Sequence, residues 1–170
     1  LVSTIEVNHT KPIIIKDEGT ANMFPVWAPD SNVFAYLSNK NNDYFGQTDL
    51  FIHNLDNDIE QKISGSVFSA PTWNPDGNII YYSKKPKFPD KNGSRYYDIY
   101  EYDLSVKKEK RLTFGARSFS PVFIESDSSI AFLATNDGSQ DVYIYNIGQD
   151  KITQITDIES RPILSSLQYN

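Results

Sequence analysis

The feature that most constrains this chain is an internal repeat. Three segments carry the same pattern, which starts with a proline two residues before an aromatic residue, at Pro25, Pro71 and Pro121. Pro162 continues the series, and successive prolines lie roughly 40–50 residues apart. Because a repeat of this length is one structural unit that stacks on its neighbours, the chain is predicted to be an array of similar units.

Each repeat contains four short segments with the composition of β-strands. In Asp98–Asp103 and Asp141–Asn146, β-branched and aromatic residues fill successive positions between turn-forming residues. Pro-Asp-Ser and Pro-Asp-Gly triplets follow the first strand of the first two repeats and are typical of tight turns. No segment has a sustained apolar period of 3.6 residues, so almost no helix is predicted. The sequence therefore predicts an all-β fold of β-propeller blades, each a four-stranded antiparallel sheet.

The predicted organisation is three full blades between two half-blades. Strands at Thr4–Asn8 and Pro12–Lys16 are expected to end a preceding blade. Strands at Arg161–Leu164 and Leu167–Tyr169 are expected to begin a following one. The predicted boundaries are 1–22 and 158–170 for the half-blades, and 23–66, 67–115 and 116–157 for the full blades.

Ring closure stays open at this stage. The half-blades can pair into a closed four-bladed unit, and two chains can self-associate to complete one ring. We favour an arc of a ring of about 6–8 blades, the upper part of the usual range. Residue 1 is Leu rather than Met, so we expect a processed or excerpted chain.

Composition excludes several classes of function. The 170 residues carry 16 Lys and Arg against 22 Asp and Glu, a formal net charge of −6, so the basic surface of a nucleic-acid-binding protein is missing. The chain has no cysteine, which rules out disulfides, thiolate zinc sites and cysteine nucleophiles. No apolar run approaches the roughly 18 residues of a transmembrane helix. We therefore expect neither a nucleic-acid partner nor a transmembrane segment.

The repeat pattern resembles that of a known family. The motif Pro-x-Trp-x-Pro-Asp-Gly/Ser, then Asp-Ile-Tyr-x-Tyr-Asp and Leu-Thr or Ile-Thr, is similar to the TolB-like, or PD40 (WD40-like), β-propeller repeat. The resemblance is strong over residues 24–113 and weaker in the third repeat, where Phe123 replaces the tryptophan. It implies a propeller like that of the periplasmic Tol system, of secreted bacterial proteins, or of prolyl-oligopeptidase-like serine peptidases.

The residues that recur at the repeat spacing are interpreted as structural. Trp27 and Trp73 are expected to pack between blades rather than to anchor a partner. The aspartates of the Pro-Asp turns are expected to cap those turns. The aspartates that open the third strands are expected to hydrogen-bond to neighbouring turns rather than to bind a cation. The structural repeat residues are Pro25, Trp27, Asp30, Asp49, Pro71, Trp73, Asp76, Asp98, Pro121, Phe123 and Asp141.

No catalytic, metal or cofactor site is predicted. His53 occupies the position of Tyr102 and Tyr145 in the other repeats, so it is expected to pack as an aromatic side chain, and His9 is placed in the turn between the N-terminal strands. The Ser64-Gly-Ser66 segment is interpreted as a turn, and no Gly-x-Ser-x-Gly or phosphate-loop motif occurs. Residues 54–60 lack the glycine and the distant glutamate of a calcium loop.

Unequal loops indicate where a partner would bind. The connections between second and third strands, predicted at 39–48, 84–97 and 135–140, emerge on one rim together with the links between blades. The longest holds five basic residues and one acidic residue, so it is expected either to contact an acidic partner or to be a solvated insertion. The predicted partner-binding residues are Lys84, Lys85, Lys87, Phe88, Lys91, Arg95 and Tyr96, with Tyr44 and Phe45 on the neighbouring loop.

Three functions follow as hypotheses. The first is a non-catalytic scaffold that binds protein partners through its rim loops, and the resemblance implies a periplasmic or secreted bacterial protein. The second is the substrate-selecting, gating propeller of a prolyl-oligopeptidase-like serine peptidase whose catalytic domain lies outside this chain. The third and least favoured is a small-molecule enzyme that uses the channel, where Asp49, Asp98 and Asp141 would act.

Overall fold

The computed structural model describes residues 2–6, 9–13, 21–90, 92–160 and 162–168, with side chains from residue 21 onward. Fourteen strands and one short 3-10 helix, η1, occur in these residues. Their bounds are β1 Val2–Glu6, β2 His9–Ile13, β3 Asn22–Trp27, β4 Val33–Ser38, β5 Thr48–Asn54, β6 Ile59–Val67, β7 Thr72–Trp73, β8 Ile79–Lys84, β9 Asp98–Asp103, β10 Lys108–Arg111, β11 Ser118–Ile124, η1 Glu125–Asp127, β12 Ser129–Asn136, β13 Ser139–Asn146 and β14 Lys151–Gln154.

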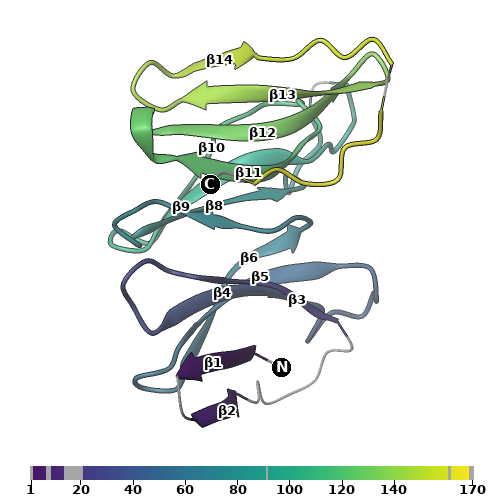
Figure 1. The fold of residues 1–170 in the computed structure, drawn as a ribbon. Helices are drawn as coiled ribbons and strands as arrows, with labels where there is room; N and C mark the ends of the chain where they lie inside the picture. The colour runs from purple at the N-terminus through teal and green to yellow at the C-terminus, as the bar shows by residue number, and fades with distance from the viewer. Residues whose placement is uncertain (1, 7–8, 14–20, 91, 161, 169–170) are drawn as a thin grey trace.

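The described strands form three stacked, four-stranded antiparallel blades and one N-terminal hairpin (Figure 1). Blade 1 contains β3–β6, blade 2 contains β7–β10 and blade 3 contains β11–β14. One pair of residues, Val67 and Lys84, joins β6, the last strand of blade 1, to β8, the second strand of blade 2. The predicted all-β fold of propeller blades, almost without helix, is therefore confirmed. In the part of the chain that the structure describes, no helix is long and apolar enough to cross a membrane.

The anchor prolines of blades 1 and 3 lie at bulges in the innermost strand. The register shifts between Met23 and Val26 in β3, and between Phe119 and Val122 in β11. The residues before the prolines, Phe24 and Ser120, have φ of 56° and 51°, outside the extended range of a strand. Proline cannot donate to the ladder, so a bulge accommodates it and increases the local twist.

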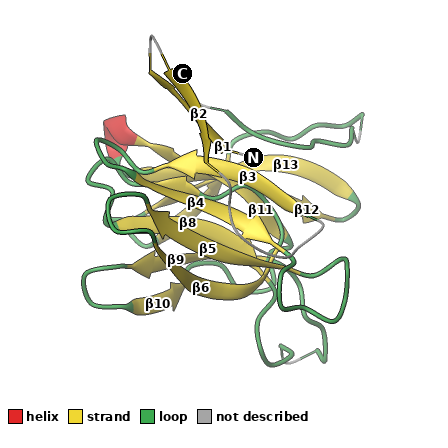
Figure 2. Cartoon of the chain, turned by 90° about the horizontal axis from the view of Figure 1, so that it is seen from below, coloured by secondary structure: helices red, strands yellow, loops and turns green. Residues whose placement is uncertain are grey.

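Turn chemistry determines how long each connection on the rim is. Asp137 and Gly138 both have positive φ, 48° and 77°, and close the β12–β13 hairpin in two residues. This connection is shorter than the predicted 135–140 loop, because the strands extend through Asn136 and from Ser139. The equivalent loops of blades 1 and 2 span residues 39–47 and 85–97. Figure 2 shows the long loops at one end of the strands, opposite the short hairpins.

Side chains that alternate along each second strand form the cores between blades. Ile80 and Tyr82 of β8 are buried against blade 1 with Leu37 and Leu50, whereas Tyr81 between them is buried against blade 3. The core between blades 2 and 3 also contains Ile99, Ile130, Phe132 and Tyr145. Loss of one such large side chain costs about 2–5 kcal/mol, so these cores hold adjacent blades together.

In blades 2 and 3 the aromatic residue of the innermost strand faces the preceding blade. Trp73 is buried, and its indole N–H donates to the carbonyl of Val26 at 3.2 Å. Phe123 of blade 3 stacks on Tyr81 of blade 2 with ring centroids 5.8 Å apart. Trp27 of blade 1 contacts Phe34 of its own blade at 5.3 Å and is 37% exposed. Packing on the preceding blade thus accounts for Trp73 and Phe123 as structural residues.

Several local expectations differ from the structure. Residues 162–168 form no strand, because a first strand needs a second strand of its own blade to pair with, and the described residues contain none. His9 begins β2 and pairs with Glu6 instead of lying in a turn. The segment 64–66 belongs to β6, which continues to Val67. The predicted N-terminal strands correspond to β1 and β2, which begin earlier, at Val2 and His9. Residues 7–8 and 14–16 of that prediction lie outside the described residues.

Candidate functional site

One rim of the blades carries the exposed aromatic side chains. It consists of the loops 39–47 and 85–97, the 137–138 turn, and the links that follow β6, β10 and β14; we call it the loop rim. Among the described residues with side chains, the aromatic residues that are more than half exposed all lie there: Tyr44, Phe45, Phe68, Phe88 and Phe114. An aromatic cluster of this kind on one face is typical of a binding surface.

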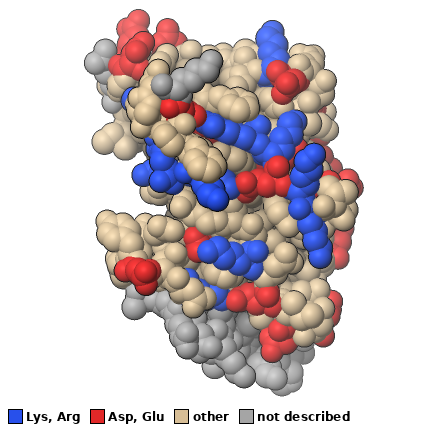
Figure 3. Space-filling model, turned by 180° about the vertical axis from the view of Figure 1, so that it is seen from behind, with Lys and Arg blue, Asp and Glu red and all other residues tan. Residues whose placement is uncertain are grey.

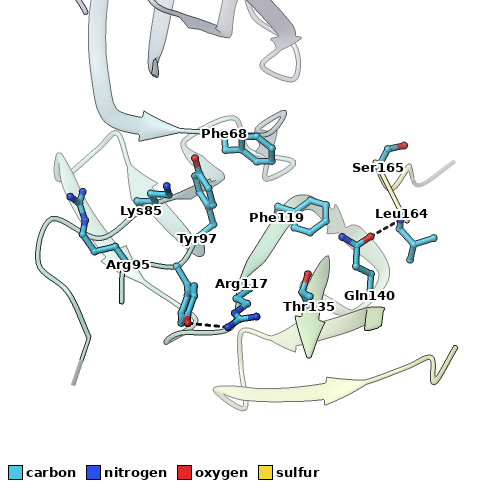
Figure 4. Close-up of a pocket in the computed structure, with 11 residues that line it drawn as sticks. Phe68, Lys85, Arg95, Tyr97, Arg117, Phe119, Thr135, Gln140, Leu164 and Ser165 are labelled. Carbon is cyan, nitrogen blue, oxygen red and sulfur yellow. Dashed lines mark hydrogen bonds between the residues drawn. The ribbon is translucent and has the colours of Figure 1, made fainter. Parts of the chain in front are cut away.

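A cavity of about 850 Å³ opens on the loop rim between blades 2 and 3 (Figure 4). The 85–97 loop and the links form one side of it, and strands β11, β12 and β13 with the segment after β14 form the other. We call it the rim cavity. It is lined by Phe68, Lys85, Arg95, Tyr96, Tyr97, Arg117, Phe119, Thr135, Gln140, Leu164 and Ser165.

Three aromatic rings form the apolar wall of the rim cavity. Phe68, which directly follows β6, lies 4.9 Å from the ring of Tyr97 and 6.5 Å from that of Phe119, in an edge-on arrangement with the latter. Tyr97 is half-buried, and burial raises the pKa of its phenol, so it stays neutral. The β11 bulge begins directly after Phe119. Sequence-distant segments thus present one continuous aromatic surface.

Three cations surround this wall. The Lys85 ammonium lies 5.0 Å from the ring centre of Tyr97, and the Arg117 guanidinium lies 4.2 Å from that of Tyr96. Arg117 also donates a hydrogen bond to the Tyr96 hydroxyl at 2.9 Å. A hydrogen bond with Ser94, then the one from Arg117, lowers the pKa of Tyr96. Arg95 donates from Nε to the carbonyl of Pro86 at 2.9 Å.

The cations of the rim cavity differ from their neighbours in having no carboxylate partner. Within the described residues, Lys85, Arg95 and Arg117 form no ion pair, and no acidic residue lines the cavity. By contrast, Lys84 pairs with Glu109, and Arg111 pairs with Asp90 and Asp98. Figure 3 shows basic side chains in a band across the middle of one face, with acidic ones beside them. The cavity is therefore a basic pocket on an acidic protein.

A polar edge closes the cavity on the side of blade 3. The Gln140 Oε1 accepts a hydrogen bond from the backbone N–H of Leu164 at 2.6 Å, as Figure 4 shows. The Ser120 hydroxyl donates to the carbonyl of Ser165 at 3.3 Å. The segment 162–168 is held against this edge by these contacts, in a conformation that is neither helix nor strand.

The predicted partner-binding residues are divided by the structure. Lys85, Arg95 and Tyr96 line the rim cavity. Lys87 lies over the ring of Phe88, 5.5 Å from its centre, and Phe88, Tyr44 and Phe45 are exposed on the loop rim outside the cavity. Lys84 is the last residue of β8, where it pairs with Glu109 and donates to Ser64, so it is not a free loop residue. Lys91 lies outside the described residues.

Sequence reasoning missed all of the other lining residues. A usable signal existed for Phe68, Arg117 and Phe119, because they precede the anchor prolines Pro71 and Pro121 closely and the links share a rim with the loops. No signal pointed to Thr135 or Gln140. They belong to the polar ends of a hairpin, and their role depends on the path of a distant segment. The residues missed are Phe68, Tyr97, Arg117, Phe119, Thr135, Gln140, Leu164 and Ser165.

The aspartates that open the third strands are buried and hold the links. Asp98 accepts hydrogen bonds from the backbone N–H groups of Gly115 at 3.1 Å and Ala116 at 3.0 Å, next to Arg117 of the cavity. Asp141 accepts one from the N–H of Ile158 at 2.9 Å, and Asp49 one from that of Ser66 at 3.1 Å. Each carboxylate satisfies backbone donors that no strand partner reaches.

Outside the loop rim, the one histidine whose side chain the structure describes, His53, has a structural environment. In the described part of the chain, no three His, Asp or Glu side chains are placed to bind a metal. His53 is buried and stacks on Phe34 at 5.4 Å, and its Nε2 lies 3.2 Å from a carboxylate oxygen of Asp58. Its Nδ1 has no hydrogen-bond partner among the described residues. His53 thus packs as an aromatic side chain, as its place in the repeat indicates.

Comparison with known proteins supports the resemblance to TolB-like β-propellers. The chain is 38% identical over 92 residues to the Tol-Pal system protein TolB of Ruthia magnifica subsp. Calyptogena magnifica, a match that covers 52% of this chain and 19% of that protein. TolB from Acinetobacter baumannii matches with a TM-score of 0.62 at 22% identity, over 81% of this chain and 32% of that one. No protein-family model matches the chain.

A peptidase propeller has a similar fold. The β-propeller domain of the Trilobed protease from Pyrococcus furiosus matches with a TM-score of 0.64 at 16% identity, over 84% of this chain and 44% of that one. The chain therefore spans less than half the length of each of these proteins. Likeness at such identity shows the fold alone.

Proposed function

We propose that this chain, a segment of a TolB-like β-propeller, is a non-catalytic scaffold that binds protein partners through its loop rim. The observation that carries the proposal is the gathering of the strongly exposed aromatic residues on one rim, beside a basic cavity. Aromatic residues and arginine are enriched at protein interfaces because they bury much area and form directional contacts. The opposite rim offers exposed aliphatic residues such as Ile59 and Val106 instead.

The fold suits such a scaffold. The loops rise from stacked cores in which Leu37, Leu50, Ile80 and Ile130 are fully buried, so the rim is presented on a rigid support. A preformed surface loses less conformational freedom on binding than a flexible one, which leaves more of the contact energy as affinity. Variation of the loops then changes the partner without changing the core.

We further propose a periplasmic or secreted location in bacteria. The support is the similarity to a Tol-Pal system protein. Fractionation of source cells checks the location. Recovery in the cytosolic fraction would contradict this part of the proposal.

The scaffold role is tested by partner capture with matched surface variants. Phe88→Ser combined with Phe114→Ser removes two strongly exposed rings from the loop rim, and Ile59→Ser combined with Val106→Ser removes two exposed apolar side chains from the other rim. Cross-linking and pull-down from envelope extracts should lose partners with the first pair by about tenfold. The second pair should capture as the unmodified protein does. Equal capture by both pairs would contradict the proposal.

A second candidate is the gating propeller of a serine peptidase. It is favoured by the structural likeness to the propeller domain of the Trilobed protease from Pyrococcus furiosus. In that case the nucleophile would lie outside this chain, in a segment with a Gly-x-Ser-x-Gly motif. Reading the complete gene and assaying peptide hydrolysis by its product decides between the candidates, because a scaffold alone hydrolyses nothing.

A further inference from the structure

The rim cavity contains binding capacity that the fold itself does not use. The ammonium of Lys85 and the guanidinium groups of Arg95 and Arg117 face no carboxylate within the described residues, although the chain as a whole is acidic. Nearby cations that serve the fold, such as Lys84 and Arg111, are paired with acids. The three cavity cations are therefore available for an anion that the chain does not supply.

The chemistry of the wall selects for a ligand that is both anionic and apolar. Phe68, Tyr97 and Phe119 form a surface on which an apolar side chain is shielded from water. Lys85 and Arg117 lie over aromatic rings at the edge of this surface. Arg117 uses one of its amino groups on Tyr96, which orients the guanidinium and leaves further N–H donors for a carboxylate.

The cavity already holds a segment of polypeptide backbone along one edge. The backbone of Leu164 and Ser165 is held there by Gln140 and Ser120, through one N–H and one carbonyl group. Side chains that hydrogen-bond to both kinds of backbone group favour a peptide over a sugar or a nucleic acid. The acidic balance of the chain argues further against a nucleic acid.

From these features we infer that the rim cavity binds a short extended peptide segment of a protein partner, with a carboxylate beside an apolar side chain. The carboxylate lies between Lys85 and Arg117, and the apolar side chain packs against Phe68 and Phe119. This inference rests on the proposed scaffold function and adds the chemical class of the segment recognised.

The test uses a fluorescent peptide of sequence Gly-Glu-Phe-Asp-Leu-Glu-Gly and the full-length protein. A matched peptide replaces each acid by its amide, and an oligogalacturonate of similar charge represents an acidic sugar. Fluorescence anisotropy should show binding of the acidic peptide, about tenfold weaker binding of the amide peptide, and a loss of affinity as salt rises. Binding of the oligogalacturonate in place of the acidic peptide would overturn the inference.

Matched variants assign the binding to the cavity. The double variant Lys85→Ala, Arg117→Ala should weaken binding of the acidic peptide about tenfold or more. Lys108→Ala with Lys151→Ala removes the same charge from exposed positions at the starts of β10 and β14 and should leave the affinity unchanged. Phe68→Ser, at a half-exposed position, should weaken binding of both the acidic and the amide peptide. Unfolding curves of all variants confirm that each is folded.

The outcomes separate this inference from the scaffold function. If the cavity double variant and the Lys108→Ala, Lys151→Ala control weaken binding of the acidic peptide equally, the binding reflects general charge attraction and the inference is overturned. If partner capture still depends on Phe88 and Phe114 while the peptide binds nowhere, the scaffold function stands and the inference falls. If the peptide binds the cavity while capture is insensitive to those rings, the scaffold proposal falls.

Discussion

Blades 2 and 3 share one strand register but use opposite chemistry at three equivalent positions. In blade 2, Tyr82, Lys84 and Glu109 form a polar group in which the tyrosine and the lysine both donate to the glutamate. Ser64 of blade 1 donates to the same glutamate at 2.9 Å and accepts from Lys84 at 3.1 Å. Hydrogen bonds thus cross the interface between blades 1 and 2.

In blade 3 the equivalent positions are all apolar. Phe132, Ala134 and Ile152 replace the tyrosine, the lysine and the glutamate, as the pairing with Tyr143, Asp141 and Tyr145 shows. Phe132 and Ala134 are buried in the core against blade 2. The fold therefore accepts either a complete polar group or none, because a buried polar atom without a partner costs free energy.

The largest difference between the two blades is expected at the aspartate that opens the third strand. Asp98→Ala leaves the N–H groups of Gly115 and Ala116 without their acceptor and leaves the Arg111 guanidinium with Asp90 as its remaining carboxylate partner among the described residues. We therefore expect a loss of about 3–5 kcal/mol in the free energy of unfolding. Asp141 pairs with no cation in the described residues, so Asp141→Ala should lower the free energy of unfolding by only about 1–3 kcal/mol. Urea unfolding measures both losses of stability, and equal losses would contradict the expected difference between blades 2 and 3.

The next effect comes from making the apolar group partly polar. Phe132→Tyr buries a hydroxyl without a partner and should cost about 1–3 kcal/mol in the free energy of unfolding. Adding Ala134→Lys and Ile152→Glu rebuilds the arrangement of blade 2 and should recover about 1 kcal/mol relative to the single variant. If the triple variant is less stable than the single variant in thermal or urea unfolding, then these positions of blade 3 do not accept even a complete polar group.

A smaller effect is expected from removing one hydroxyl of the polar group. Tyr82→Phe deletes the hydrogen bond to Glu109 and should lower the free energy of unfolding by about 1 kcal/mol. Tyr100→Phe, on the ring that stacks on Tyr82 at 6.3 Å, is the control and should change stability by about 0.5 kcal/mol at most. The result contradicts the account if the two variants are equally stable.

The smallest expected effect is a pH dependence at the interface between blades 1 and 2. Burial opposes ionisation of Glu109, but hydrogen bonds from Lys84 and Tyr82 outweigh it and lower the pKa below its ordinary value of 4.5. The stabilisation that ionised Glu109 provides is therefore fully present above pH 4.5 and is lost as the pH falls through the lowered pKa. Glu109→Gln should flatten the acid limb of a stability–pH curve.

Glu101 provides the opposite sign as a control. Burial raises the pKa of Glu101, so the folded state binds its proton more tightly and this residue adds stability as the pH falls. Glu101→Gln should steepen the acid limb slightly. Acid limbs that respond alike to both substitutions would contradict the assignment.

The repeat made the blades predictable because their chemistry is local. Pro-Asp turns, alternating strands and the opening aspartates each act within a few residues, so equal patterns form equal structures. Lys84 was misplaced because a strand boundary is set by pairing, here with Asp98, rather than by composition. The rim cavity was only partly predicted: Phe68, Gln140 and Leu164 meet there from separate elements, and no local pattern encodes that meeting.

Photo-cross-linking in living cells tests the central claim most directly. A photoreactive amino acid is placed at Phe88 or Phe114 on the loop rim, and at Val106 on the opposite rim as the control. We predict that light produces a protein adduct of defined mass from the two loop-rim positions and none from Val106. Adducts from Val106 alone, or equally from all three positions, would contradict binding through the loop rim.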